Sequence, residues 1–302
     1  MPDTILVPTD GSKESERALD IAIPLAVALD ADITLLWAWD GLGAMDGIIT
    51  PDVLANISDR ETADRNTFLE DLAARHCRPV GVAYRCEVPI ERPVQAILDA
   101  TEPVNVRYVI MATHGRSGFK RWRLGSVADK IARTVDKPVV LFRPDEATSL
   151  RDAIQRILVP LDGSLSSEAA LPHAIAIARA SGASLHLLRV VSAIVTATPV
   201  GLDAVYSHAN DAALEAAVAD LDKLAQELTD PGHGPADGLD VTTAVFMGGP
   251  STAILERASD TDLIVMASHG RGGVTRFALG SITDAVIRGS GKPVMVVPRR
   301  ES

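Results

Sequence analysis

Residues 5–12 read Ile-Leu-Val-Pro-Thr-Asp-Gly-Ser, and residues 157–164 read Ile-Leu-Val-Pro-Leu-Asp-Gly-Ser. The similarity extends outward, because residues 5–40 align without gaps on residues 157–192 with 18 of 36 positions identical. Residues 111–144 and 266–299 likewise share 15 of 34 positions. A repeat of about 150 residues has the size of a whole domain. The 302-residue chain is therefore predicted to hold two copies of one domain, residues 1–146 and 154–302.

Apolar runs alternate with segments of helical periodicity in both copies. Short continuous apolar runs are typical of strands buried on both faces, and their alternation with helices indicates an open parallel sheet that helices cover on both sides. Ligands of such sheets bind beyond the carboxyl ends of the strands, where the winding reverses. Strands are expected at residues 3–8, 33–39, 81–88, 106–112 and 138–142, and again at 156–160, 184–191, 239–246, 262–267 and 293–297. In the first copy, helices are expected from Ser12 or Ser15 to about Leu29, over residues 52–76 and 93–100, and after Gly125.

The composition limits the classes of function. A net charge of −11 argues against a broad nucleic-acid surface, although it leaves room for a local phosphate site. Two cysteines, Cys77 and Cys86, are too few for a secreted disulfide framework, and both are interpreted as buried apolar residues. No signal peptide and no apolar run of membrane-spanning length are recognised. The expectation is a soluble cytoplasmic protein that contacts neither nucleic acid nor membrane.

The first repeated motif places an aspartate at the end of the first strand, followed by glycine and serine. Asp10 and Asp162 would lie at the carboxyl edge of the two sheets. A carboxylate there could accept hydrogen bonds from ribose hydroxyls or help to hold a metal. It could equally well cap the helix that follows. The residues alone leave these readings open.

The second motif follows the fourth strand of each copy. It reads Ala112-Thr113-His114-Gly115, nine residues, then Gly125-Ser126, and it recurs as Ala267-Ser268-His269-Gly270, nine residues, then Gly280-Ser281. Glycines let the backbone approach phosphate oxygens, and the helix that starts after Gly125 or Gly280 offers free N–H groups and its positive dipole end. The hydroxyls of Ser126 and Ser281 can add hydrogen bonds. Identical spacing in both copies favours a phosphate-binding loop over a chance turn.

This loop resembles the ATP-binding signature G-x2-G-x9-G-[S/T] of universal stress proteins, and the opening Val-Pro-x-Asp-Gly-Ser is also typical of that family. The resemblance covers nearly the whole chain, as a tandem two-domain member. It implies five-stranded parallel sheets of order 3-2-1-4-5, of the adenine-nucleotide α-hydrolase-like, Rossmann-like kind. It also implies ATP as the ligand, with Mg²⁺ or Mn²⁺ arriving with the nucleotide.

The resemblance assigns roles to particular positions. Asp10 and Asp162 would contact the nucleoside, and the backbone at Ala38 and Val190 would meet the adenine. Gly115, Gly125 and Ser126, with Gly270, Gly280 and Ser281, would hold the phosphates. The remaining candidates for nucleotide contact are Pro8, Thr9, Ala112, His114, Arg116, Gly118, Val127, Pro160, Leu161, Gly248, Ala267, His269, Arg271, Gly273 and Ile282.

Two departures from the family pattern bear on the two sites. Ala112 and Ala267 replace the first glycine, which is harmless only if their φ is negative. After the third strand, the second copy has Gly248-Gly249-Pro250, whereas the first has residues 89–93 without glycine, and Glu91 there could repel an anion. The first site is therefore expected to be the weaker. The first loop, however, is the richer in basic residues, with Arg116, Lys120, Arg121 and Arg123 against Arg271 and Arg276.

No catalytic residue is assigned, because no nucleophile and carboxylate are spaced to form a triad with His114 or His269. No side-chain metal site is predicted either. The leading hypothesis is an ATP-binding regulator of a stress response, with at most slow hydrolysis. The alternatives are an adenine-nucleotide-using enzyme and an interaction module that works without nucleotide. Residues 139–142 and 294–297 are expected to pair the two copies as a pseudo-dimer. A homodimer and unknown protein partners are further expectations.

Overall fold

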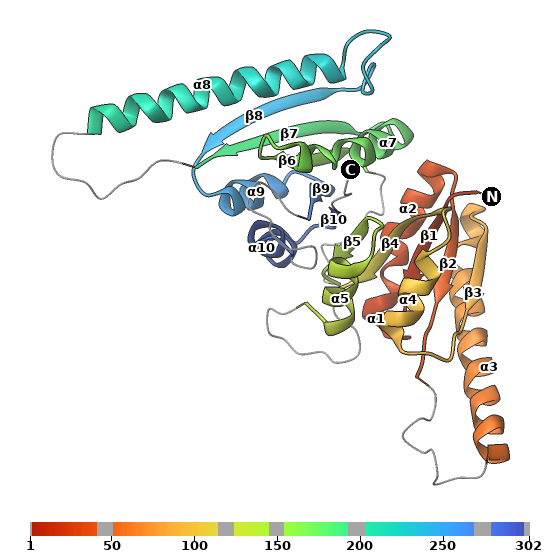
Figure 1. The fold of residues 1–302 in the computed structure, drawn as a ribbon. Coiled ribbons are helices and arrows are strands. Elements are labelled where there is room, and N and C mark those ends of the chain that lie inside the picture. Colours follow the sequence, from red (N-terminus) through yellow and green to blue (C-terminus); the bar gives the residue numbers. More distant parts are fainter. Residues whose placement is uncertain are drawn as a thin grey trace. The chain divides into compact units, whose positions relative to one another are not determined.

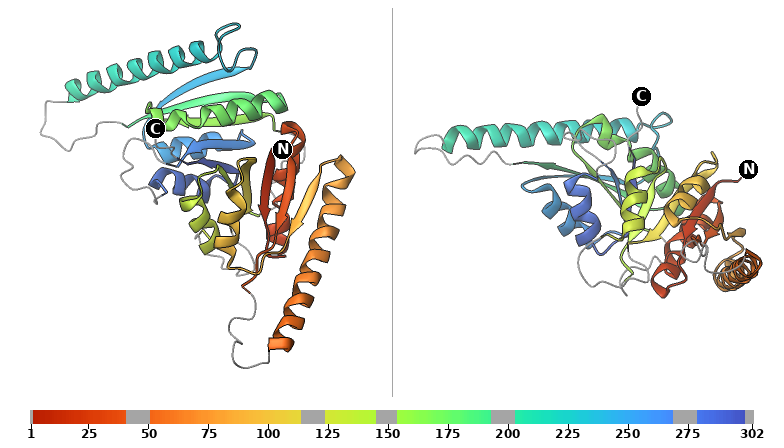
Figure 2. Two further views of the ribbon diagram at one scale, coloured as in Figure 1. Left: turned by 45° about the vertical axis from the view of Figure 1, so that its right-hand side comes forward. Right: turned by 60° about the horizontal axis from the view of Figure 1, so that its bottom comes forward.

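A computed structural model describes residues 2–40, 51–113, 124–144, 154–192, 203–268 and 279–298. The chain divides into two compact units, Met1–Arg151 (unit 1) and Asp152–Ser302 (unit 2). Each unit contains five strands and the helices that connect them (Figures 1 and 2).

Unit 1 follows the predicted alternation of strand and helix. Its elements are β1 (Thr4–Pro8), α1 (Lys13–Glu16), α2 (Leu19–Leu29), β2 (Asp32–Leu36), α3 (Pro51–His76), a 3₁₀ turn at Arg78–Val80, β3 (Tyr84–Glu87), α4 (Pro93–Thr101), β4 (Val106–Ala112), α5 (Ser126–Thr134) and β5 (Val139–Phe142).

Unit 2 repeats this order without the 3₁₀ turn. Its elements are β6 (Arg156–Leu161), α6 (Leu165–Glu168), α7 (Leu171–Ser181), β7 (Ser184–Val191), α8 (Asp203–Leu228), β8 (Val241–Met247), α9 (Pro250–Ala258), β9 (Leu263–Ala267), α10 (Ser281–Gly289) and β10 (Val294–Val297).

The strand order within each unit confirms the predicted 3-2-1-4-5 arrangement. Unit 1 runs β3-β2-β1-β4-β5 and unit 2 runs β8-β7-β6-β9-β10. Neighbouring strands of a unit are parallel, with Thr4 opposite Asp32 and Arg156 opposite Ser184 at the start of the central pairs. The winding reverses between β1 and β4 and between β6 and β9. The crevice beyond the carboxyl ends of these strands is therefore where this architecture binds its ligands.

Aliphatic strands form the core of each unit. β1, β5, β9 and β10 are buried along their whole length, as expected of strands covered on both faces. The long helix of each unit lies along the edge strand, α3 against β3 and α8 against β8 (Figure 1). Helices α4 and α5 pack on each other, as do α9 and α10. Both α4 and α9 open with proline at their first turn, which costs no hydrogen bond there.

The helix expected from Ser12 to Leu29 is interrupted in the structure. Helix α1 ends at Glu16 and α2 begins at Leu19, and unit 2 has the same break between Glu168 and Leu171. The N–H of Ala18 bonds the carbonyl of Ser15, three residues back, so the chain tightens between the two helices. The sequence pattern missed this break because the apolar rhythm continues across it.

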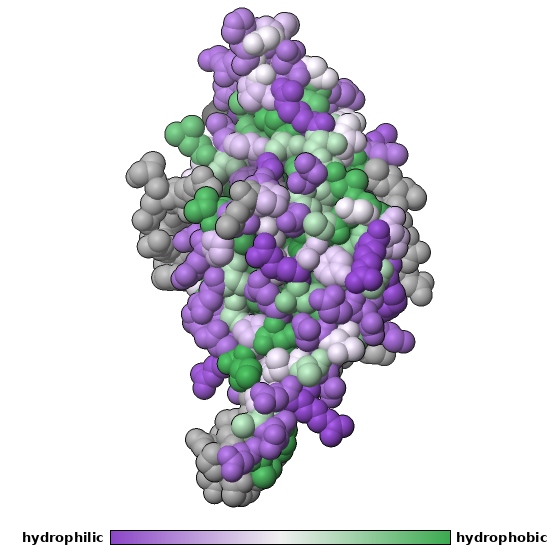
Figure 3. Space-filling view, turned by 90° about the vertical axis from the view of Figure 1, so that its right-hand side faces the viewer, coloured by the Kyte–Doolittle hydropathy of each residue, from purple (hydrophilic) through white to green (hydrophobic). Residues whose placement is uncertain are grey.

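The surface carries apolar residues that are dispersed among hydrophilic ones on the face shown in Figure 3. Val104 and Leu165 are the most exposed of the large apolar side chains in the described ranges. Of the helices that the structure describes, none is at once long and apolar enough to cross a bilayer.

Candidate nucleotide site

The turn after β1 is organised around the carboxylate of Asp10. Its Oδ1 accepts hydrogen bonds from the backbone N–H of Ser12 (3.0 Å), from the Ser12 hydroxyl and from the Ser15 hydroxyl (2.9 Å). The Ser12 hydroxyl in turn accepts from the N–H of Ser15 and caps α1. Of the two possible caps, Ser12 is thus the one used, and Asp10 supports it.

Unit 2 builds the same turn around Asp162. Its Oδ1 accepts from the backbone N–H (2.9 Å) and the hydroxyl (2.6 Å) of Ser164, which caps α6. The turns differ at the preceding residue: Thr9 bonds the Ser15 hydroxyl at 2.7 Å, whereas Leu161 is apolar and buried. In both units one carboxylate oxygen orders the turn while the half-buried side chain stays at the ligand edge of the sheet.

Gly11 is required in the unit 1 turn for two reasons. Its φ is +73°, in the left-handed region that favours glycine, and a Cβ added there would overlap the indole of Trp37. Trp37 is held by an edge contact to Phe68 on α3, with centroids 5.2 Å apart, and the Arg65 guanidinium lies 5.3 Å from its ring. The turn that carries Asp10 therefore rests on α3 through one tryptophan.

The equivalent contact in unit 2 is ionic. Arg189 takes the position of Trp37, and it pairs with Asp220 of α8 at 3.4 Å. Helices α3 and α8 are both 26 residues long, and Asp220 occupies the position in α8 that Phe68 occupies in α3. The Arg189 side chain is 14% exposed. The two units thus use different chemistry to fix the second strand to the long helix.

A pocket of about 90 Å³ lies at the carboxyl ends of the unit 2 strands. One wall is apolar and comes from three elements: Val190 at the end of β7, Ile254 on α9 and Met266 on β9. The β6 turn contributes Asp162, and the first turn of α10 contributes Ile282 and Thr283. The Thr283 hydroxyl is held by the carbonyl oxygens of Ala267 and Ser268, at 3.2 and 3.3 Å. The pocket thus joins apolar side chains, a carboxylate and a helix N-terminus.

The predicted glycine loops have their two ends pinned together. The N–H of Gly125 donates to the carbonyl of Thr113 at 2.7 Å, and that of Gly280 donates to Ser268 at 2.9 Å. Each glycine is the N-cap of its helix, and neither α5 nor α10 has a side-chain cap. Among the described residues, no side chain caps these helices, and helix N-termini of this kind suit an anion. Both glycines have φ near −60°, so their backbone geometry would admit alanine.

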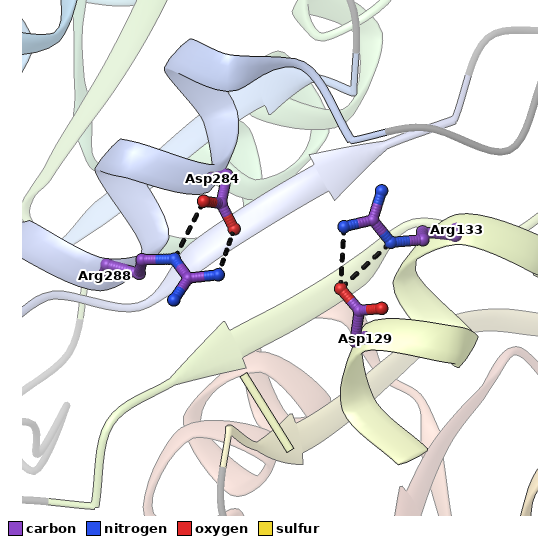
Figure 4. Close-up of polar contacts among 4 residues, drawn as sticks. All are labelled: Asp129, Arg133, Asp284 and Arg288. Carbon is purple, nitrogen blue, oxygen red and sulfur yellow. Dashed lines mark hydrogen bonds and ion pairs between the residues drawn. The ribbon is translucent and has the colours of Figure 1, made fainter. Parts of the chain in front are cut away.

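An ion pair follows the first turn of each of these helices (Figure 4). The guanidinium of Arg288 binds both carboxylate oxygens of Asp284 at 2.8 Å, and Arg133 contacts Oδ1 of Asp129 at 2.8 and 2.9 Å. A carboxylate near a helix N-terminus would compete with a bound anion for the helix dipole. Pairing with arginine offsets that negative charge in both units.

Ala112 and Ala267 sit at the ends of β4 and β9. Asp30 is the one residue other than glycine with positive φ in the described part of the chain, so neither alanine is strained. The replacement of glycine by alanine at these two positions therefore meets the condition of negative φ that the sequence analysis set.

The segment after the third strand differs between the units as the sequence indicated. The N–H of Gly248 donates to Val191, and that of Glu91 donates to Trp39 in the matching position. Gly248 has φ +145°, a backbone conformation that other residues rarely adopt, and it lies two residues before Pro250, which lines the pocket. Unit 1 places the half-buried Glu91 side chain at this point.

Six of the predicted contact residues line the unit 2 pocket, and nine others begin α5 or α10 or lie at the ends of β1 and β2. Lining it are Pro160, Leu161, Asp162, Val190, Ala267 and Ile282. Gly280 and Ser281 begin α10, and Gly125, Ser126 and Val127 begin α5. Pro8 ends β1, Thr9 and Asp10 follow β1, and Ala38 follows β2. His114, Gly115, Arg116, Gly118, His269, Gly270, Arg271 and Gly273 lie outside the described residues.

Six lining residues were missed from the sequence: Ser167, Leu188, Pro250, Ile254, Met266 and Thr283. Three of them carried a usable signal. Ile254 lies one turn after Pro250, on the apolar face of α9. Thr283 lies three residues after Gly280, the last glycine of the loop motif. Pro250 belongs to the Gly248-Gly249-Pro250 segment that the sequence had already singled out, whereas Leu188 and Met266 looked like ordinary core. Within the described ranges, no three His, Cys, Asp or Glu side chains gather as a metal site.

These features define a class: a tandem α/β protein with two open parallel sheets of the same strand order, and with a pocket at the topological switch point of unit 2. Comparison with known proteins identifies the family within that class. The sequence pattern of the universal stress protein family matches residues 1–143 and again residues 153–298. The chain belongs to the universal stress protein family.

Individual relatives agree with this assignment. A universal stress protein of Mycolicibacterium smegmatis is 27% identical over 303 residues, covering 98% of this chain and 97% of the relative. The crystal structure of a universal stress protein from Archaeoglobus fulgidus has the same fold, with a TM-score of 0.65, 24% identity and 98% coverage of both chains. One solved universal stress protein is described as a complex with cAMP; it is 26% identical, covers 49% of this chain and all of its own, and has a TM-score of 0.33.

Proposed function

We propose that this protein binds ATP at the carboxyl edge of its sheets and acts as a nucleotide-dependent regulator of a stress response. The observation that carries the proposal is the unit 2 pocket, where the apolar wall of Val190, Ile254 and Met266 meets Asp162 and the start of α10. An apolar pocket with a few convergent polar groups is the usual form of a small-molecule site.

Each part of the pocket suits one part of an adenine nucleotide. The apolar wall suits a flat base, and a volume of about 90 Å³ accommodates a ring rather than a whole nucleotide. The Asp162 carboxylate is an acceptor that suits ribose hydroxyls and repels phosphate. The uncapped N-terminus of α10 suits phosphate oxygens. Magnesium or manganese would then arrive with the nucleotide, held chiefly by phosphates and water.

Hydrolysis is proposed to be slow at most. The described residues of the pocket include one carboxylate, Asp162, which orders its own turn through Oδ1 and which the proposal assigns to the ribose hydroxyls. A general base must reach the attacking water with a free acceptor. Regulation through a bound nucleotide is therefore favoured over turnover. An enzyme that uses an adenine nucleotide, or an interaction module without one, are the alternatives.

The second site is proposed to bind more tightly than the first. Gly248 carries no side chain beside the unit 2 pocket, whereas Glu91 brings a carboxylate to the matching place in unit 1. The cytoplasmic location, the pairing of residues 139–142 with 294–297, a homodimer and protein partners stay predictions.

The first test is the nucleotide content of the purified protein, measured by anion-exchange chromatography after denaturation. One adenine nucleotide per chain is the expected result, and two would show equal sites. No nucleotide, with no uptake of added ATP and Mg²⁺ by calorimetry, would favour the nucleotide-independent module.

The matched variants are Gly125→Ala, Gly280→Ala and the double change. Alanine fits the backbone at φ near −60°, so the fold should survive, but the methyl group stands where phosphate must approach. Gly280→Ala should remove the tight site, Gly125→Ala should spare it, and the double variant should bind no nucleotide. Unchanged calorimetric affinity in the double variant, with native circular dichroism, would contradict the phosphate role of these helices.

A further inference from the structure

A second pocket of unit 2 lies at the opposite end of its sheet. It has a volume of about 120 Å³ and is formed at the amino ends of β6, β7 and β8, beneath the last turn of α9. The candidate nucleotide pocket occupies the carboxyl ends of the strands and the first turn of the same helix. The two pockets lie toward opposite ends of α9 and share one lining residue, Leu188, so the second pocket contains none of the polar groups of the nucleotide site.

Polar side chains from adjacent strands meet inside this pocket. His186 on β7 lies beside Thr242 on β8, with Nδ1 and Oγ1 2.6 Å apart. The other ring nitrogen, Nε2, lies 3.2 Å from the hydroxyl of Ser184. The imidazole is thus fixed between two hydroxyls, and it presents a rigid polar floor.

Two arginines border the same pocket. Arg156 begins β6 and Arg257 lies near the end of α9, and both side chains reach solvent. Within the described part of the chain, neither guanidinium has a carboxylate within 4.0 Å; that of Arg257 lies 4.6 Å from the Phe246 ring centroid. Their donors are therefore not consumed by ion pairs inside the unit.

The electrostatics at His186 show that both charges act on the pocket floor. The pKa of His186 lies below its ordinary value, first because of burial, then because of Arg156 and, more weakly, Arg257. Asp240 opposes them, and Asp260 lines the pocket as well. The summed charge is small, so any attraction must come from directed guanidinium contacts, and the expected affinity is modest.

Unit 1 does not repeat this set of residues. The offset of the repeats and the strand registers place other side chains at the positions of Arg156, His186, Thr242 and Arg257, namely Thr4, Thr34, Arg85 and Ala100. A merely structural role common to both copies of the fold would not need the unit 2 set.

We propose that this pocket binds a small oxyanion, a carboxylate or a phosphate, between the guanidinium groups of Arg156 and Arg257 and the hydroxyl of Thr242. The planar fork of arginine matches both anions with paired hydrogen bonds. A cavity of about 120 Å³ is of the size that admits a molecule of a few heavy atoms. The site stands independently of nucleotide binding at the other end of α9.

The test is an NMR titration of the intact protein that follows the imidazole signals of His186, assigned by their loss in His186→Asn. Sodium acetate and sodium phosphate are the two probes, and sodium chloride at equal ionic strength is the control. A saturable shift with acetate identifies a carboxylate site, and one with phosphate identifies a phosphate site; either supports the proposal. The bound anion should also raise the pKa of His186. The proposal would be overturned if chloride shifted the His186 signals equally, or if neither acetate nor phosphate gave a saturable shift.

The decisive variant pair is Arg156→Gln/Arg257→Gln against Arg179→Gln. Arg179 is an exposed arginine of α7 that contacts the carbonyl of Pro235, outside the pocket. Loss of two charge-assisted contacts should weaken the anion roughly tenfold or more, whereas Arg179→Gln should leave binding unchanged. Glutamine keeps the exposed stems, and an unchanged amide spectrum establishes the fold. Wild-type affinity in the double variant would refute the site.

Discussion

At the scale of single residues, Gly11 links the sequence motif to the fold. The motif Asp-Gly-Ser was explained by the needs of a turn, but the structure adds a packing reason, since the Trp37 indole covers the Cα of Gly11. The sequence could not reveal this contact, because Trp37 lies 26 residues further along the chain, just after β2, and its counterpart in unit 2 is an arginine.

Gly11→Ala should lower the free energy of unfolding of unit 1 by about 2–4 kcal/mol, since positive φ and overpacking each cost on the order of 1–3 kcal/mol. Gly81 is the matched control: its φ is +74°, but nothing lies within 4 Å of an added Cβ. Gly81→Ala should therefore show the conformational cost alone, about 1 kcal/mol. Urea unfolding followed by tryptophan fluorescence measures both. An equal loss of unfolding free energy in both variants would mean that the Trp37 side chain moves aside without destabilising unit 1.

His186 gives a prediction of pH dependence. Burial and the nearby arginines hold its pKa below 6.5, so the unfolded chain takes up a proton at a higher pH than the folded unit does. Stability that is present above pH 6.5 is therefore lost as the pH falls toward the folded pKa. His186→Asn keeps a polar partner for Thr242 but cannot titrate. Between pH 7 and 5 its urea midpoint should fall less than that of the wild type, and parallel losses would contradict the pKa shift.

At the scale of elements, sequence reasoning succeeded where one pattern decides the outcome. Val106–Ala112 and Ser184–Val191 were predicted to the residue, whereas the strands predicted at residues 33–39 and 81–88 are shorter, Asp32–Leu36 and Tyr84–Glu87. The break between α1 and α2 was missed, since it comes from a local hydrogen bond and leaves the apolar rhythm intact. Pocket residues such as Met266 were missed because lining a site and filling a core require the same side chain.

The ion pair of α10 supports an element-scale prediction (Figure 4). Arg288→Gln would leave the Asp284 charge in the first turn unbalanced, so nucleotide affinity should drop roughly two- to fivefold, as expected for 0.3–1 kcal/mol at a helix N-terminus. Folding should change little, because both side chains are about one third exposed. The double variant Asp284→Asn/Arg288→Gln should recover the affinity.

Calorimetry with ATP at low salt and at 0.5 M salt would check this prediction. The loss should shrink at high salt, because exposed charges are screened. Asp129→Asn/Arg133→Gln on α5 provides the same comparison in unit 1, through the equivalent ion pair. A loss that the second change does not restore would point to a steric effect of Arg288 instead.

At the scale of the whole molecule, the repeat allows each unit to serve as the control for the other. The folds are the same, strand by strand, yet equivalent positions around the ligand edge have diverged: Ala38 corresponds to Val190, Trp37 to Arg189, and Glu91 to Gly248. Divergence at a site on a retained scaffold is the pattern expected when two copies have taken different tasks. Under the proposed function, unit 2 would bind the nucleotide tightly, and unit 1 would bind it weakly or not at all.

Val190→Trp and Ala38→Trp test that division in the intact chain. The indole should fill the unit 2 pocket of about 90 Å³, so Val190→Trp should lower the bound adenine nucleotide at least tenfold. Ala38→Trp changes the equivalent position and should leave the tight site in place. The readout is nucleotide content together with calorimetric stoichiometry. A larger effect of Ala38→Trp would assign the tight site to unit 1, and no effect of either would mean that adenine binds elsewhere than at the ends of β2 and β7.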